Sequence, residues 1–429
     1  MSKNFNIAIA GLGNIGEYFF LKLQSQKKDI LKKTNSKYKI RSVCVKNLKK
    51  KRLIKKSGLK IHNKISKIYN DHDIHIVVEL IGGAEGAAKK LVFESLKNGK
   101  HVITANKALM AKYGDELTKI AEKNKVNLEF EASVCAGVPI IRAIKEGLVA
   151  NKISKIYGIF NGTSNYILTS MTHNQISFDE ALNKAKSLGY AESNPKSDLN
   201  GEDVAAKLKI LSSISFNSKI NHSIYIEGIK NIDNTDIINA DNLGYRIKLL
   251  AFGEIVGNKI CQRVHPTMIG KNSLVSNIDG VLNAVIINGE PVGQSIFQGE
   301  GAGPKATTSA LISDLCSILR GNIKYPFSIP HKDRKKIKSF PISDNNFSFY
   351  VRLEVFDNKG VLSDITKIFS DNKISIKRLI QNPYKSKKHS SIVIITHNTR
   401  NIFLFKTVRK LSNKHYIIKR PKFIRIDNS

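Results

Sequence analysis

A glycine-rich turn close to the N-terminus constrains the fold of this chain more than any other sequence feature. Residues 6–10 form an apolar run typical of a short buried strand, and residues 11–16 follow directly as Gly-Leu-Gly-Asn-Ile-Gly. Residues 17–23 then continue with helical periodicity. Strand, glycine turn and helix in this order predict the first βαβ unit of a parallel α/β sheet.

The three glycines of this turn have separate roles in a dinucleotide-binding unit. Gly11 permits the tight turn, Gly13 lets the backbone approach a pyrophosphate, and Gly16 lets the helix pack closely on the strand. The N-terminus of the helix would then face the phosphates. The cofactor-binding positions expected here are Gly11, Leu12, Gly13, Asn14, Ile15 and Gly16. The alternative is a glycine-rich turn in an α/β unit of another kind.

The residues after the second predicted strand bear on which dinucleotide is preferred. An NAD-preferring site places an acidic side chain near the end of this strand, where it bonds the ribose 2′-hydroxyl. Here the strand of residues 40–45 is followed by Lys46 and Asn47, and then by the cationic run of residues 49–52. Cations suit a 2′-phosphate, so we expect NADP, with Lys46 as a contact and NAD as the second choice. A solvated basic loop is the competing interpretation.

Two further apolar strands extend the predicted sheet. Residues 74–80 lead to a pair of glycines, and residues 101–104 lead into Lys107, with a helical stretch between the two strands. Open parallel sheets bind ligands beyond the carboxyl ends of their strands. We therefore expect a Rossmann-type domain and a ligand contact from Lys107. A loop lysine without such a role is the simpler alternative.

An acid and a lysine share one face of a helix in the middle of the chain. Asp203 and Lys207 are four residues apart at the start of residues 203–214, which have helical periodicity. At about 100° per residue both side chains fall inside the apolar stripe, whereas Lys209 falls on the opposite, solvent-facing side. Burial is expected to lower the pKa of Lys207 toward the range useful for proton transfer. The alternative is an ordinary surface pair.

Composition and charge exclude several classes of protein. The 429-residue chain has a formal net charge of +35, but its lysines are spread along the sequence, and its densest basic runs have no interleaved aromatic residues. Nucleic-acid binding is therefore not expected. No apolar run reaches about 18 residues, so no membrane-spanning helix is expected. The N-terminus has no apolar signal region and the four cysteines are scattered, which predicts a cytoplasmic protein.

Six motifs between residue 5 and about residue 322 occur in the order of one enzyme family. They are residues 11–16, Ala-Asn-Lys-Ala at 105–108, Glu-Ala-Ser-Val at 131–134, Gly-Ile-Phe-Asn-Gly-Thr at 158–163, residues 189–207 and Gly-Glu-Gly-Ala-Gly at 299–303. With these motifs the chain resembles homoserine dehydrogenase. The resemblance implies a homo-oligomeric oxidoreductase that interconverts L-homoserine and L-aspartate 4-semialdehyde with NAD(P). This step leads toward threonine, methionine and isoleucine.

The resemblance also implies roles for individual residues. Lys207 matches the family's proposed proton donor, and Asp203 matches an acid that positions the lysine and the substrate. Glu192 and Asp198 are expected to bind the substrate ammonium, because a buried cation needs anionic partners. A turn residue and a helix N-cap are the alternatives for these two acids. The other substrate-binding positions expected are Lys107, Gly162, Thr163 and Tyr190, and Lys107 and Gly303 are expected beside the cofactor.

A monovalent cation site is implied by the resemblance alone. Members of the family hold a cation, usually sodium, with a glutamate and nearby backbone carbonyls. The matching positions are Glu131, Val134, Ala136 and Val138. Oxygen ligands suit a hard cation. A buried, hydrogen-bonded glutamate without a cation is the alternative for Glu131.

The C-terminal part of the chain is predicted to form a separate domain. Residues 323–345 contain three prolines among lysines and serines, which is typical of a linker. Residues 346–429 follow the order βαββαβ of a ferredoxin-like unit. They resemble the ACT domain, with Asp357 and Gly360 matching its signature and Lys359 where proline is usual. The resemblance implies a small-molecule effector, with threonine as the family expectation, and a dimerisation or stability unit is the alternative.

The predicted fold class is therefore α/β, with a Rossmann-type domain, an α+β substrate and dimerisation domain and a ferredoxin-like C-terminal domain. The expected boundaries are 1–135 for the first domain, completed by about 300–322, then 136–299 and 346–429. Two other functions compete with homoserine dehydrogenase. One is another NAD(P)-dependent amino-acid or oxo-acid oxidoreductase with an amino-acid-sensing domain, and the other is a non-enzymatic regulatory protein.

Overall fold

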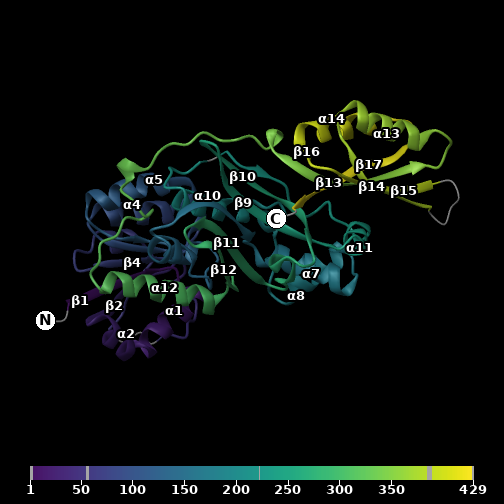
Figure 1. The fold of residues 1–429 in the computed structure, drawn as a ribbon. Helices are drawn as coiled ribbons and strands as arrows, with labels where there is room; N and C mark the ends of the chain where they lie inside the picture. Colours follow the sequence, from purple (N-terminus) through teal and green to yellow (C-terminus); the bar gives the residue numbers. More distant parts are fainter. Residues whose placement is uncertain (1–2, 55–57, 222, 384–388, 428–429) are drawn as a thin grey trace.

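The computed structural model describes residues 3–54, 58–221, 223–383 and 389–427 (Figure 1). Its N-terminal sheet is parallel throughout. The strand order is β3-β2-β1-β4-β5-β6, as predicted for a Rossmann-type domain. Helices α4 and α5 cover one face, and α1, α2 and α12 cover the other (Figure 1). The elements are β1 (Lys3–Ala10), α1 (Asn14–Ser25), α2 (Lys27–Thr34), β2 (Ser36–Cys44), β3 (Lys60–His62), α3 (Ser66–Tyr69), β4 (Ile76–Glu79), α4 (Ala87–Lys97), β5 (His101–Thr104), α5 (Lys107–Lys123) and β6 (Leu128–Glu129).

The glycines of the turn after β1 meet different steric demands. Gly11 has a φ of 102°, and a Cβ there would lie 2.4 Å from the carbonyl oxygen of Leu80. A Cβ at Gly16 would lie 2.1 Å from the carbonyl oxygen of Gly11. At Gly13, in contrast, an added Cβ has no atom of the described residues within 4 Å. The turn and the helix packing therefore require Gly11 and Gly16, whereas Gly13 leaves space for a ligand to approach the backbone.

A second sheet forms the middle of the chain and continues into its C-terminal part. Its order is β12-β11-β7-β9-β10-β17-β13-β15-β14, antiparallel along this path except between β10 and β17. The elements of the middle domain are α6 (Ile140–Arg142), β7 (Lys152–Ile159), α7 (Gly162–Asn174), α8 (Phe178–Ser187), α9 (Lys196–Leu199), α10 (Glu202–Ser215), β8 (Tyr225–Ile226), α11 (Asn234–Asn242), β9 (Tyr245–Val256), β10 (Lys259–Gly270), β11 (Leu282–Glu290) and β12 (Gly293–Glu300). Among the described residues, no helix is long and apolar enough to cross a membrane.

Helix α12 (Pro304–Leu319) returns from the middle domain to the parallel sheet. Leu311 and Leu315 share a hydrophobic core with Phe19 and Phe20 of α1. The N-cap residue of α12 is Gly303, with a φ of 101°. The chain therefore crosses between the two domains twice, and the second crossing leaves Gly303 at their boundary.

The C-terminal region has the predicted ferredoxin-like order. Its elements are β13 (Asn346–Phe356), α13 (Val361–Asp371), β14 (Ile376–Pro383), β15 (His389–Thr396), the short β16 (Thr399–Arg400), α14 (Asn401–Ser412) and β17 (Ile417–Asp427). The strand order β17-β13-β15-β14 is that of a split βαβ unit. Strand β17 also pairs with β10, with Arg425 opposite Thr267, so the sheet crosses the domain boundary.

The segment between α12 and β13, predicted as a linker, is fastened to the body of the protein. Arg334 is only 2% exposed, and its Nη2 donates to the Ser213 hydroxyl at 2.6 Å and to the Ser218 carbonyl at 2.8 Å. The same nitrogen lies 2.8 Å from a carboxylate oxygen of Asp115. The guanidinium carbon is 4.1 Å from the ring centre of Phe327. The segment is therefore a packed connection and not a free spacer, because one buried arginine ties it to α5 and α10.

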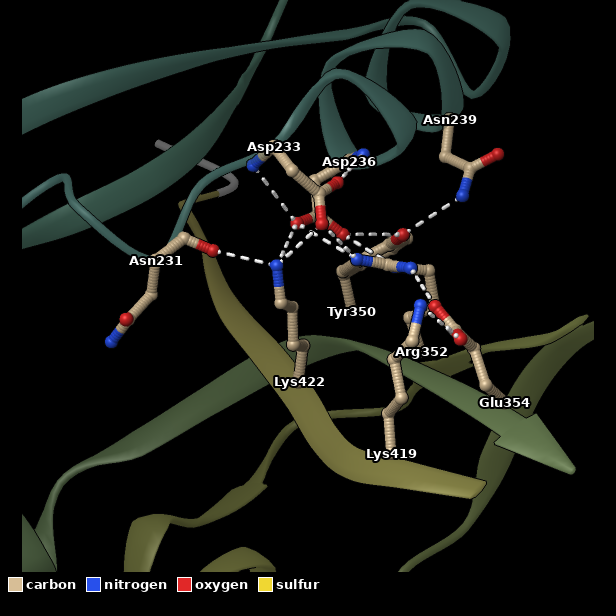
Figure 2. A network of polar contacts seen from close by, with 9 residues as sticks. All are labelled: Asn231, Asp233, Asp236, Asn239, Tyr350, Arg352, Glu354, Lys419 and Lys422. Carbon is tan, nitrogen blue, oxygen red and sulfur yellow. Dashed lines mark hydrogen bonds and ion pairs between the residues drawn. The ribbon is translucent and has the colours of Figure 1, made fainter. Parts of the chain in front are cut away.

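A buried polar network joins the C-terminal domain to the middle domain (Figure 2). Asp233 and Asp236 form the capping box of α11, and Arg352 of β13 donates to them at 2.7 Å and 2.8 Å, respectively. The Tyr350 hydroxyl donates to Asp236 at 3.1 Å, and Lys422 of β17 pairs with Asp233. Burial alone would lower the pKa of Arg352, but the hydrogen bond and charge of Asp236 raise it. Two carboxylates of the middle domain are thus neutralised by cations of the C-terminal domain.

Candidate active site

Helix α10 carries a buried acid and lysine pair, as the helical wheel predicted. It begins after Gly201, whose φ of 84° reverses the chain direction where α9 ends. The Lys207 ammonium donates to the Asp203 carboxylate at 2.8 Å and to the Phe160 carbonyl at 2.7 Å. The side chains of Asp203 and Lys207 are 3% and 9% exposed. This pair is therefore buried and hydrogen-bonded, and the surface-pair alternative is wrong.

The protonation of this lysine differs from the expectation. Burial lowers the pKa of Lys207, but the neighbouring Asp203 carboxylate outweighs burial, and the net effect raises it. For Asp203, burial raises the pKa, but Lys207 and Lys107 together lower it well below its usual range. The expectation of a lowered lysine pKa was wrong because the ion pair opposes desolvation. Lys209, expected in solvent, is half-buried and has a pKa lowered by burial, because α10 is packed between α5 and the sheet.

A second lysine reaches the same carboxylate from the parallel sheet. Lys107 is the first residue of α5, and its ammonium pairs with the other oxygen of Asp203. The side chain of Asn106 caps α5 by accepting the Leu109 N–H at 3.0 Å, and it donates to the Gly83 carbonyl at 2.7 Å. Asp203 thus bridges two ammonium groups from two domains, one buried and one 43% exposed.

Asn161 links two acids, Asp198 of α9 and Asp203 in the first turn of α10. Its amide nitrogen donates to Asp198 at 2.9 Å and to Asp203 at 2.9 Å, while its oxygen accepts the Ser164 N–H at 2.8 Å as the N-cap of α7. The pKa of Asp198 is raised by burial and by the charge of Asp203. The alternative role of Asp198 as a helix N-cap was wrong, because Pro195 occupies that position in α9. Asn161 lies in one of the matched motifs, but no role was predicted for it. Its position directly between a predicted strand and a helix was the signal that could have indicated one.

The expected substrate-binding residues surround one cavity of about 590 Å³. The Thr163 hydroxyl donates to the Tyr190 carbonyl at 2.6 Å, and the Tyr190 ring lies 5.0 Å from that of Tyr166. A Cβ at Gly162 would lie 2.6 Å from the carbonyl oxygen of Val281, so this wall requires glycine. The cavity is lined by Lys107, Gly162, Thr163, Tyr190, Glu192, Asp198, Asp203, Lys207 and Gly303 among the expected residues.

Some lining residues were missed by sequence analysis, and some expected residues lie elsewhere. Asn283 and Glu300 line the cavity from β11 and β12, and a Cβ at Gly301 would overlap the Asn283 amide. Asn283 has no sequence signal, because only the fold brings β11 to α10. Residues 11–16, Lys46 and the expected cation site do not line this cavity.

The loop after β2 has a defined shape beside the glycine turn. The Gly11 N–H donates to the Cys44 carbonyl at 2.9 Å, which joins the turn to the end of β2. Lys46 follows and is exposed. The Arg52 guanidinium donates to the carbonyls of Asn47 and Lys50 at 2.8 Å and 2.9 Å. One arginine thus holds the cationic loop closed at the position where a ribose 2′ substituent would be recognised.

Glu131 is buried at the junction of the two domains and is hydrogen-bonded. Its two carboxylate oxygens accept the N–H groups of Ile141 and Arg142 at 2.9 Å and 2.8 Å. Burial raises the pKa of Glu131 to about 7, although these two hydrogen bonds oppose the shift. Asp314 and Glu129 are also buried here, and Asp314 pairs with the Arg142 guanidinium at 3.3 Å. No group of three His, Cys, Asp or Glu side chains in the described parts of the chain is arranged to hold a metal ion.

Comparison with known proteins identifies the family. The family model described as homoserine dehydrogenase matches residues 139–316, and that described as homoserine dehydrogenase, NAD binding domain, matches residues 11–131. The homoserine dehydrogenases of Helicobacter pylori and Neisseria gonorrhoeae are each 38% identical, over 100% and 92% of both chains in each pair. Among solved structures, a homoserine dehydrogenase from Thiobacillus denitrificans has a TM-score of 0.92 and 36% identity over 99% of both chains. One from Staphylococcus aureus has a TM-score of 0.78 and 31% identity over 100% of both chains.

The matched ranges contain the glycine turn, the paired lysines and the acids around the cavity, so the likeness covers the site as well as the fold. The chain belongs to the homoserine dehydrogenase family of NAD(P)-dependent oxidoreductases.

Proposed function

We propose that the chain interconverts L-homoserine and L-aspartate 4-semialdehyde with NADP, and that Lys207 is its proton donor. The observation that carries this proposal is the Asp203–Lys207 pair, which lines the cavity with its charges buried. An alkoxide formed in such a site needs a cationic hydrogen-bond donor. The second function considered is another NAD(P)-dependent amino-acid or oxo-acid oxidoreductase, and a generic reductase of this kind has no use for acids that can hold an ammonium group.

The cofactor and the side chains have separate roles in the proposed reaction. When bound, NADPH would supply the hydride that adds to the aldehyde carbon. Lys207 then donates a proton to the oxygen as negative charge develops there, and the neutral amine regains a proton from solvent. Asp203 keeps the lysine charged before the reaction, since it raises the pKa of Lys207. Lys107, paired with the other oxygen of Asp203, keeps the carboxylate in place and adds positive charge beside the oxygen.

The substrate ammonium is assigned to two further acids of this cavity. Asp198 and Glu192 both line it, and Asn161 holds Asp198 in place. Gly162, Thr163 and Tyr190 line the same cavity and are proposed as further substrate contacts. A substrate with an ammonium group near its reacting carbon would therefore be bound more tightly than one without it.

The preference for NADP is assigned to Lys46. It is exposed after β2, where an NAD-specific enzyme would carry an acid, and Arg52 closes the loop around it. The glycine turn at 11–16 and Gly303 at the N-terminus of α12 are the proposed pyrophosphate and nicotinamide contacts.

The proposal also includes a cation site, an effector, a homo-oligomeric state and the division into domains. A monovalent cation is assigned to Glu131 with the carbonyls of Val134, Ala136 and Val138, since a cation there would favour the ionised form of a carboxyl whose pKa burial raises. The donor set is oxygen only, which suits sodium. Threonine is the proposed effector at residues 346–429, and the active enzyme is a homo-oligomer. The proposed domains are 1–135 completed by about 300–322, then 136–299 and 346–429, with 323–345 as the connection.

The initial rate of NADPH formation from L-homoserine tests this function. We expect turnover with L-homoserine and at least about 100-fold less with 4-hydroxybutanoate, which lacks the ammonium. We expect a higher kcat/KM with NADP than with NAD, and Lys46→Glu should reverse that order. Equal rates with both hydroxy acids would contradict the substrate assignment, and an unchanged cofactor preference in Lys46→Glu would remove Lys46 from its role.

A further inference from the structure

A second large cavity lies away from the proposed active site. It has a volume of about 850 Å³ and lies between residues 225–236 of the middle domain and α14 with β17 of the C-terminal domain. One of its walls is the network of Figure 2, because Asn231, Asp236 and Lys422 belong to both. A site here would be shared by the two domains.

The floor of this cavity is apolar. Ile232, Pro266, Val408 and Ile424 line it and are buried, and the ring of Phe423 adds to this surface. Apolar surface of this kind favours an aliphatic group at about 25 cal/mol per Å² removed from water. The apolar floor therefore favours a ligand with an aliphatic part, but it does not determine the charge of that ligand.

The rim of the cavity is cationic after the internal ion pairs are counted. The two lining acids are already neutralised: Glu227 pairs with Arg425 at 2.9 Å and Asp236 with Arg352 at 2.8 Å. Arg409 and Arg420 also line the cavity and are exposed. Within the described part of the chain, neither of these two arginines has an acid within 4.0 Å. The rim therefore offers donors for an anion and no unpaired acid for an ammonium group.

We propose that this interdomain cavity binds a small aliphatic carboxylate, with its hydrocarbon part on the apolar floor and its carboxylate between Arg409 and Arg420. Lys422 stands at the same rim and could exchange its bond to Asp233 for the ligand. A zwitterionic amino acid fits less well, since its ammonium would face the two arginines.

The cavity wall also supports the segment that carries the active-site acids. The Ile229 N–H donates to the Leu199 carbonyl at 2.9 Å, and a Cβ at Gly228 would lie 2.1 Å from that same carbonyl oxygen. Leu199 directly follows Asp198 in α9. Any shift of residues 227–229 on binding would therefore move Asp198, so we expect the ligand to alter turnover. This part of the inference rests on the proposed role of Asp198.

Binding is tested with 4-methylpentanoate as the probe on the full chain, with saturating L-homoserine present to fill the active-site cavity. Ligand-observed NMR titration should give a Kd of about 1 mM, which is reasonable for eight heavy atoms. The double variant Arg409→Glu/Arg420→Glu should raise this Kd at least about 10-fold. The control Lys406→Glu/Lys410→Glu makes the same change in charge on exposed positions of α14 outside the cavity, and it should change the Kd less than about 2-fold.

Two further ligands test the assigned chemistry. 4-Methylpentan-1-amine, which has the opposite charge, should not bind, and L-leucine should bind at least about 5-fold more weakly than the probe. The proposal is overturned by absence of probe binding at about 20 mM, by equal binding to the arginine double variant, or by tighter binding of L-leucine. The last result would identify an amino-acid site.

Coupling to the active site has its own readout. In the unmodified enzyme, saturating 4-methylpentanoate should change kcat or KM for L-homoserine at least about 2-fold. The arginine double variant should keep its basal rate and lose this response. Binding without any change in kcat or KM would reject the coupling, and it would not bear on the proposed function, which the rate without the probe tests separately.

Discussion

At the scale of single residues, Asp203 is the common partner of both lysines in the proposed site. Its two oxygens hold one ammonium each, and it is almost completely buried. Helical spacing was enough to predict that Asp203 and Lys207 share a buried face. The direction of the lysine pKa shift was not predictable, because desolvation and ion pairing are opposing effects of similar size. Only the distances within the folded site show that ion pairing dominates.

Asn161 is predicted to position two neighbouring acids, Asp198 and Asp203, by donating a hydrogen bond to each. In Asn161→Asp, a third carboxylate would replace the amide that donates to Asp198 and Asp203. We expect kcat/KM for L-homoserine to fall about 100-fold at pH 8, which corresponds to about 3 kcal/mol of lost stabilisation. The loss should become smaller toward pH 6, because like charges raise the pKa of the added acid and low pH neutralises it.

The matched control for this variant is Asn174→Asp, an exposed change on the last turn of the same helix. It should retain kcat/KM within about 2-fold and show an unchanged pH profile. If Asn161→Asp also remained within about 3-fold of the original rate at pH 8, Asn161 would have no positioning role.

At the scale of helices and strands, local sequence patterns predicted the elements but not which of them lie side by side in the fold. The glycine turn, the helix at 202–215 and the βαββαβ order were all predictable from periodicity and turn residues. Asn283 and Glu300 reach the cavity only because β11 pairs with β7 and β12 pairs with β11, and the pairing of β11 with β7 has no local signal. Asp198 lies in a one-turn helix that short-range patterns cannot separate from a loop.

The segment at Glu131 is predicted to make stability depend on pH and on the salt present. Its folded pKa of about 7 lies above the ordinary 4.5, so the folded state retains a proton that the unfolded chain releases. Stability from this group is complete below about pH 4.5 and is lost as pH rises through 7, by about 3 kcal/mol in total. In choline chloride, the free energy of unfolding in urea should fall over this range.

Sodium should offset that loss above pH 7, because a cation stabilises the ionised carboxylate. The variant Glu131→Gln should show a smaller fall, because the buried Asp314, whose pKa burial also raises, still titrates, and it should show no sodium effect. A pH-independent stability in choline chloride would contradict the assigned titration, and equal values in sodium and choline at pH 8 would contradict the cation site.

At the scale of the whole molecule, several connections hold the C-terminal domain. They include the pairing of β17 with β10, the ion pair of Arg425 with Glu227, and the network of Asp233 and Asp236 with Arg352 and Lys422 (Figure 2). The packed segment around Arg334 is a further connection. Composition predicted a linker, because prolines and lysines are typical of exposed spacers. It could not show that one arginine of that segment is buried, since the hydrogen-bond partners of Arg334 lie more than a hundred positions away in the sequence.

Replacement of Arg334 is predicted to destabilise the protein strongly. Arg334→Ala removes a buried cation together with its ion pair to Asp115 and its hydrogen bonds to the Ser213 hydroxyl and the Ser218 carbonyl, which should cost about 3 kcal/mol in urea unfolding. The neighbouring exposed Lys335→Ala should cost less than about 0.5 kcal/mol. Equal stability of the two variants would show that the segment is a free linker after all.

The central claim is that the Lys207 ammonium protonates the substrate oxygen, and the variant Lys207→Met tests it most directly. Methionine keeps the length and packing of the side chain but has no proton to donate. We predict that kcat for reduction of L-aspartate 4-semialdehyde falls about 1,000-fold while the Kd for NADPH, measured by fluorescence titration, changes less than about 2-fold. A Lys207→Met enzyme that retained kcat within about tenfold of the original would contradict the account.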